Sequence, residues 1–187
     1  MFARRVNDDI ELRLLEEHHV EEFYAWQMRN REYLREWLDW PLDDKYTMEE
    51  SRGFIKRRLK GFAEGNGFEA GIWHRGELVG EVSIDRIDRT NRVAEMGYSL
   101  GANFQGRGIV TASMRALIDY AFDELKLHRV ELRCAAENLK SRAVAERLGF
   151  TQEGELRESW LIHGRFVGQV VYGMLAAEWR VGALKSS

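Results

Sequence analysis

The chain has 187 residues, of which 44% are apolar and 32% charged, and its formal net charge is −3. This length predicts one domain that can bury a core, and the composition is typical of a globular protein. The slight acidic excess argues against nucleic acid as a partner, which would require a basic surface. The single cysteine, Cys134, excludes a disulfide framework and a Cys-x-x-Cys metal site.

The first residues of the chain carry two arginines with no apolar stretch behind them, which is unlike a signal peptide. No segment of about 18 apolar residues occurs, so we expect no membrane span. Both observations predict a cytoplasmic protein.

The first third of the chain predicts a strand followed by helices. Residues 10–14 alternate apolar and charged side chains, which indicates a strand. Aromatic and aliphatic residues over 20–38 indicate one or two short helices. Thr47, followed three residues later by Glu50, is a capping box, and it predicts a helix that ends near Gly65.

The remainder of the chain alternates strands with helices. Strands are predicted at 68–74, 77–85, 92–100 and 129–135, helices at 109–125 and 138–147, and a closing pair of strands around His163-Gly164. This order predicts an α/β or α+β domain of three layers, in which helices pack on a mixed sheet.

A glycine-rich turn lies between the strand at 92–100 and the next helix. In Gln105-Gly106-Arg107-Gly108 the glycines allow close approach of an anion to the backbone N–H groups at the helix start, or they only supply a turn. A Walker loop is excluded because Ile109 follows in place of lysine. The dinucleotide fingerprint fails at Thr111, where it requires glycine.

Several motifs together resemble one superfamily. Gln105-x-x-Gly108-x-Val110 is similar to the Q/R-x-x-G-x-G/A acyl-CoA loop of the GNAT N-acetyltransferases, although Val110 departs from the small last position. Asn138-Leu-Lys-Ser141 with Leu148-Gly149-Phe150 resembles the N-x-x-S…LGF segment of the same enzymes. Ala94-Glu95-Met96-Gly97-Tyr98 and Leu34-x-x-Trp37-Leu38-x-Trp40-Pro41 resemble the branch that acetylates N-terminal serine or alanine of ribosomal proteins.

The resemblance covers residues 10–180 of what we expect to be one N-acetyltransferase domain, 1–187. It implies a mostly antiparallel sheet of about seven strands, splayed between strands 4 and 5, with helices on both faces. It also implies a homodimeric, metal-free enzyme that transfers acetyl from acetyl-CoA to a primary amine, with the N-terminal amine of a ribosomal protein as the leading acceptor. A small-molecule amine, another acyl-CoA and a non-catalytic CoA-binding module stay open, the last because Ala145 stands where relatives carry tyrosine.

The resemblance assigns cofactor contacts to two segments. The pantetheine arm would pair with the backbone of Ser99 and Leu100, at the end of the fourth strand. Asn138 would contact the cofactor, or cap the following helix, or do both. The pyrophosphate would lie on the loop formed by Gln105, Gly106, Arg107, Gly108, Ile109 and Val110.

Glu95 and Ser141 are the predicted catalytic residues. Glu95 would accept the amine's proton through a water, unless it is an ordinary strand glutamate paired with Arg92. Ser141 would orient or protonate the departing thiolate, unless it is an ordinary residue in the first turn of the helix. His163 is an alternative base.

For the acceptor, the resemblance places three tryptophans, Trp26, Trp37 and Trp40, along an apolar wall, with core packing as the competing interpretation. Glu69, Glu81 and Asp85 could bind a cationic amine, but their strand positions favour solvated faces.

Overall fold

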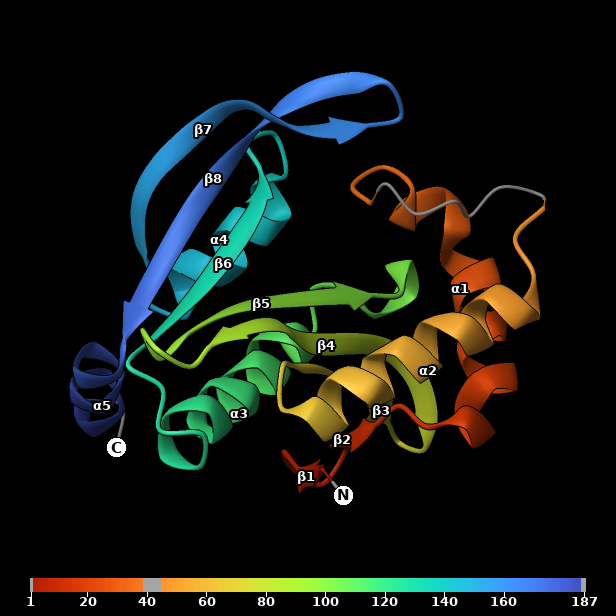
Figure 1. Cartoon of the computed structure of the whole chain (residues 1–187), viewed down its shortest axis with the longest axis horizontal. Helices are drawn as coiled ribbons and strands as arrows, with labels where there is room; N and C mark the ends of the chain where they lie inside the picture. Colours follow the sequence, from red (N-terminus) through yellow and green to blue (C-terminus); the bar gives the residue numbers. More distant parts are fainter. Residues whose placement is uncertain (1, 39–44, 186–187) are drawn as a thin grey trace.

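A computed structural model describes residues 2–38 and 45–185 of the chain (Figure 1). Within them the elements are β1 (Ala3–Arg5), β2 (Ile10–Leu14), η1 (Glu17–His19), α1 (Val20–Leu34), α2 (Met48–Glu64), β3 (Phe68–His74), β4 (Glu77–Asp88), β5 (Val93–Leu100), η2 (Ala102–Phe104), α3 (Ile109–Asp123), β6 (Arg129–Ala135), α4 (Leu139–Arg147), β7 (Thr151–Ile162), β8 (Arg165–Leu175) and α5 (Ala176–Lys185). No helix in these ranges is long and apolar enough to cross a membrane.

The described strands form one sheet of eight in the order β1-β2-β3-β4-β5-β6-β8-β7. All neighbours are antiparallel except β5 and β6, which are parallel and connected through α3. The expected mixed, mostly antiparallel sheet is confirmed, but the expected count of seven strands is one too low. The missing strand is β1, whose three residues are too few to give an alternating pattern.

The sheet splits between β5 and β6. These strands pair only from Val93–Met96 to Arg129–Leu132, although β5 continues to Leu100 and β6 to Ala135. In Figure 1 the strands β6, β8 and β7 rise away from β5 beyond this point. The fourth and fifth predicted strands are β5 and β6, because β1 was not predicted, so the predicted splay is confirmed. Beyond the split, the facing backbone edges of the two strands are not paired with each other.

Helices cover both faces of the sheet, as expected. Successive side chains of a strand point to opposite faces, so each strand contributes to two apolar clusters. Phe68, Ala70 and Ile72 of β3 pack with α3, whereas Trp73 packs with α1 and α2. The capping box of α2 is also confirmed, because the Glu50 N–H donates to Thr47 Oγ1 over 3.3 Å.

Candidate functional site

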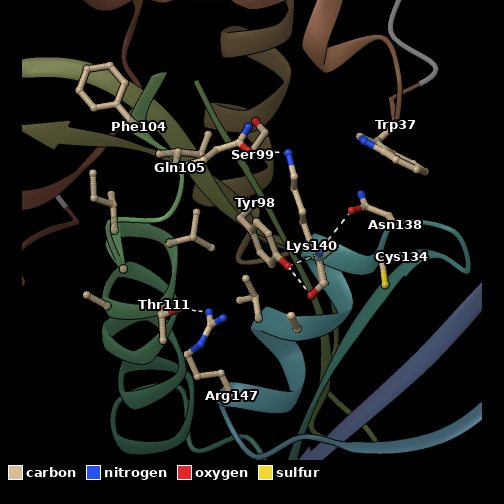
Figure 2. A pocket seen from close by; sticks show the side chains of 18 of the residues that line it. Trp37, Tyr98, Ser99, Phe104, Gln105, Thr111, Cys134, Asn138, Lys140 and Arg147 are labelled. Carbon is tan, nitrogen blue, oxygen red and sulfur yellow. Dashed lines mark hydrogen bonds between the residues drawn. The ribbon is translucent and has the colours of Figure 1, made fainter. Parts of the chain in front are cut away.

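The split between β5 and β6 holds a cavity of about 1210 Å³, which we call the α3-side cavity. Most of its lining comes from the end of β5, the loop after it, the first turns of α3, the end of β6 and α4 (Figure 2), and the end of α1 and Trp160 of β7 also contribute. Ser99 and Leu100 lie at its rim, on the stretch of β5 that does not pair with β6. The structure therefore brings together the two segments that the sequence motifs singled out.

The loop before α3 has the geometry of an anion site. Gly106 and Gly108 have φ angles of +72° and +73°, a left-handed conformation that non-glycine residues adopt at a cost. Gly108 is the N-cap of α3 and provides no side-chain cap. Among the described residues, no acceptor pairs with the N–H groups of Ile109, Val110 or Thr111. Free N–H groups at a helix start bind anions.

The first two residues of α3 present mainly their backbone to a ligand. The side chains of Ile109 and Val110 are buried in the core. Arg107 does not line the cavity, since its guanidinium lies 5.3 Å over the Phe104 ring. Of the loop residues predicted to bind the pyrophosphate, Arg107 is the one that does not line the cavity.

Two cations that sequence reasoning missed face the loop from α4. Lys140 Nζ donates to Gln105 Oε1 over 2.9 Å, and Arg147 Nη1 donates to Thr111 Oγ1 over 3.2 Å (Figure 2). Both residues line the α3-side cavity. Their positive charges add to the electrostatic attraction of the helix start for an anion.

A pair of hydroxyl groups lies at the inner end of this cavity. Asn138 Oδ1 accepts from the Ser141 N–H over 3.1 Å, which confirms Asn138 as the N-cap of α4. Ser141 Oγ lies 2.6 Å from the hydroxyl of Tyr98, a residue of β5 that sequence reasoning did not assign a role. Burial raises the pKa of Tyr98 above its usual range, so its hydroxyl stays protonated. Burial likewise raises the pKa of the Cys134 thiol.

A second cavity of about 450 Å³, the α2-side cavity, lies on the face of the sheet covered by α2. The residues that line both cavities are Leu38, Tyr98, Ser99, Arg133, Cys134, Ser141 and Trp160. The two cavities therefore meet at the split in the sheet.

Buried acids line the α2-side cavity. Glu69 and Glu81 are each only 5% exposed, so the expectation of solvated faces is wrong for them. Helix α2 covers this face and supplies Arg58, whose Nε lies 3.0 Å from Glu69 Oε2 and whose Nη2 lies 3.0 Å from Asp85 Oδ1. Desolvation raises the pKa of Glu69 well above its usual range and that of Glu81 to about 7.

The predicted base, Glu95, also lines the α2-side cavity. Its side chain is 32% exposed and lies 3.8 Å from Arg133 Nε. It belongs to the part of β5 that is still paired with β6, where it stands opposite Glu131. The alternative base, His163, is exposed on the turn between β7 and β8 and lines neither cavity.

The aromatic wall differs from the prediction. Trp37 lines the α3-side cavity, whereas Trp26 is 1% exposed and stacks on Phe23 in the core, so its assignment to the substrate is wrong. Trp40 lies outside the described residues. Trp160 of β7 lines both cavities and was missed, because it lies far from the other motifs in sequence.

The comparisons with known proteins agree with this geometry. Residues 9–151 match the acetyltransferase (GNAT) domain family. YdaF of Bacillus subtilis (strain 168), provisionally named a ribosomal N-acetyltransferase, is 38% identical over 96% of this chain and 98% of its own length. The ribosomal-protein-serine acetyltransferase of Escherichia coli (strain K12) is 30% identical over 87% of this chain and 90% of its own.

A solved structure is similar over nearly the whole fold. RimL, a ribosomal L7/L12 α-N-protein acetyltransferase in complex with coenzyme A, superposes with a TM-score of 0.90 at 28% identity, covering 95% of this chain and 99% of that one. The split sheet, the glycine loop and these similarities lead to one conclusion, that the chain belongs to the GNAT family and is an acetyltransferase.

Proposed function

We propose that the protein transfers the acetyl group of acetyl-CoA to the N-terminal α-amine of a protein, with a ribosomal protein as the leading acceptor. The observation that carries the proposal is the junction of two cavities at the split between β5 and β6. An anion-binding loop lies on one side of this junction and buried carboxylates lie on the other. The names of the relatives point to the same class of acceptor.

The α3-side cavity suits acetyl-CoA. The free N–H groups at the start of α3, together with Lys140 and Arg147, would hold the phosphates. The unpaired edge of Ser99 and Leu100 would bind the amides of the pantetheine arm, as an added strand would. Asn138 stays in place as the cap of α4 and faces the same cavity.

The α2-side cavity suits a cationic primary amine. Its volume of about 450 Å³ lies within the range of roughly 300–1,000 Å³ that is usual for small ligands, so it accommodates the first residues of a chain. Leu38, Phe54 and Trp160 give it an apolar wall. Glu69 and Glu81 supply negative charge at its inner surface.

The residues at the junction would perform the transfer. Acetyl-CoA supplies the thioester carbonyl, and a base must first make the amine neutral so that its lone pair can attack. The paired hydroxyls of Ser141 and Tyr98 would donate a hydrogen bond to the sulfur as it leaves with negative charge. Glu95 is one candidate base, because it faces the amine side.

An acceptor panel tests the proposal. The protein is incubated with acetyl-CoA and with four kinds of amine: peptides with a free N-terminal serine or alanine, the same peptides with a blocked α-amine and one lysine, spermidine, and free amino acids. We expect thiol release and a single acetyl group on the free α-amine, detected by mass spectrometry. Acetylation of spermidine or of the blocked peptides alone would instead establish a small-molecule or side-chain acetyltransferase.

We propose in addition that the enzyme acts in the cytoplasm, because ribosomal proteins are made there. We also propose that it is a homodimer, as the resemblance to the family implies. Size-exclusion chromatography with light scattering gives the mass of the particle and tests the dimer directly.

A further inference from the structure

Glu81 occupies a special position at the split. On β4 it stands directly opposite Ser99, at the end of β5 where the strand has left β6. Ser99 Oγ donates to Glu81 Oε1 over 2.7 Å. The second oxygen, Oε2, is buried and has no hydrogen-bond partner among the described residues. Glu81 lines the α2-side cavity, so a small side-chain rotation would present this unpaired oxygen to a ligand there.

Negative charge exceeds positive charge around Glu81. Arg58 is the cation that interacts with Glu81, and it already contacts the carboxylates of Glu69 and Asp85. Its Nη2 also donates to the carbonyl oxygens of Phe68 and Ile84. One guanidinium therefore faces three carboxylates. A buried excess of this kind is relieved by a proton or by a bound cation.

The register separates Glu81 from the other acids. Glu95 is four residues before Ser99 on the same strand, about 13 Å away along it, and Arg133 lies beside it. Glu69 has its carboxylate against Arg58. Among Glu69, Glu81 and Glu95, Glu81 is the one whose carboxylate is hydrogen-bonded to a residue that lines both cavities.

We propose that Glu81 is the carboxylate that binds the ammonium group of the acceptor and removes its proton, an inference that rests on the proposed function. One N–H proton of the ammonium passes to Glu81 Oε2, and the neutral amine forms a C–N bond to the thioester carbonyl. The C–S bond then breaks, and the departing thiolate takes a second proton from nitrogen. The protonated Glu81 returns its proton to solvent, so the products are an amide, CoA thiol and one proton.

The electrostatics of the cavity support this role. The other titratable groups that line this cavity are Arg58, Glu69, Asp85, Glu95, Tyr98, Arg133, Cys134 and Tyr172, and Tyr46 also interacts electrostatically with Glu81. Desolvation raises the pKa of Glu81 to about 7, and the Ser99 bond and Arg58 oppose that shift. An α-amine has a pKa of about 8, so transfer of its proton to Glu81 is unfavourable by only about tenfold. For an aliphatic side-chain amine, near 10.4, the penalty exceeds about a thousandfold. The difference between the two penalties is a property of the amines themselves and would be the same for any base in this cavity.

The test compares three isosteric variants with an Ala-Ala-Ala peptide amide as acceptor and acetyl-CoA as donor. Glu81→Gln should lower kcat/KM at pH 7 by about a hundredfold or more, with the acetyl-CoA Kd changed less than about twofold. The deficit should shrink above pH 9, where the amine arrives without its extra proton. Glu77→Gln, on the same strand but exposed, should retain wild-type rates. Glu95→Gln removes the competing candidate base and so tests it in the same assay.

The outcomes separate the two proposals. If the wild-type protein binds acetyl-CoA but acetylates no amine of the panel, the proposed function fails and the inference fails with it. If the wild type is active and Glu81→Gln is equally active, or its deficit is the same at every pH, only the inference is overturned. A hundredfold loss confined to Glu95→Gln also overturns it. Should Glu81→Gln fold poorly, Ser99→Ala provides the second test, since loss of its bond should move the acid limb of the pH profile upward, and an unmoved limb would contradict the role of Glu81.

Discussion

Replacing Glu81 with glutamine should stabilise the fold, and the gain should grow with pH. Because burial holds the folded-state pKa of Glu81 at about 7, above the 4.5 of a free glutamate, the folded protein binds this proton more tightly than the unfolded chain does. The wild-type protein therefore loses stability as pH rises from about 4.5 through about 7. A shift of this size corresponds to about 3 kcal/mol, as an order of magnitude.

Glutamine carries no charge at any pH, so Glu81→Gln escapes that loss. We expect the variant to exceed the wild type in free energy of unfolding by about 3 kcal/mol more at pH 8 than at pH 4, or roughly 6–12 °C in Tm. Urea denaturation at intervals between pH 4 and pH 8 measures the difference, with the exposed Glu77→Gln as the matched control. A difference that stays constant across this range would refute the buried, proton-binding state of Glu81.

Two further predictions concern the cofactor side of the site. Gly108→Glu places a carboxylate at the anion-binding start of α3, so acetyl-CoA affinity should fall at least about tenfold in calorimetry. Gly164→Glu has the same left-handed φ on the exposed β7–β8 turn and controls for backbone strain; equal affinities of the two variants would contradict the phosphate loop. Ser141→Ala removes a hydroxyl that would bond to the leaving thiolate, so kcat should fall roughly tenfold or more with the acetyl-CoA Kd unchanged. An unaltered kcat would exclude Ser141 from the chemical step.

Features that depend on neighbouring residues could be predicted from the sequence. The cap of α2 needs only Thr47 and Glu50, and the cap of α4 needs only Asn138 and the Ser141 N–H, each pair three residues apart. Left-handed glycines before α3 follow from the same local chemistry. The motif order then indicated the family and with it the split sheet, which no single segment encodes.

Features that depend on distant residues could not be predicted in this way. Trp26 and Trp37 belong to one apolar stretch, and only the packing of α1 against α2 buries the first while the second lines a cavity. Tyr98 and Ser141 are brought within hydrogen-bond distance by the divergence of β5 from β6. Trp160 lines both cavities although β7 is the edge strand, because the β7–β8 hairpin reaches back to the end of α1, where His163 Nε2 lies 2.8 Å from the Arg35 carbonyl oxygen.

The sequence by itself determined the order of elements, the helix caps and the loop that faces the cofactor, because each rests on contacts within a few residues. Only the tertiary structure decided whether the acidic side chains on the strands are buried or exposed to water. An alternating strand places Glu69 and Glu81 on one face, but it does not say whether that face meets water or a helix. Helix α2 covers it and brings Arg58, so these carboxylates are desolvated, and Glu81 stands beside Ser99 where the sheet opens.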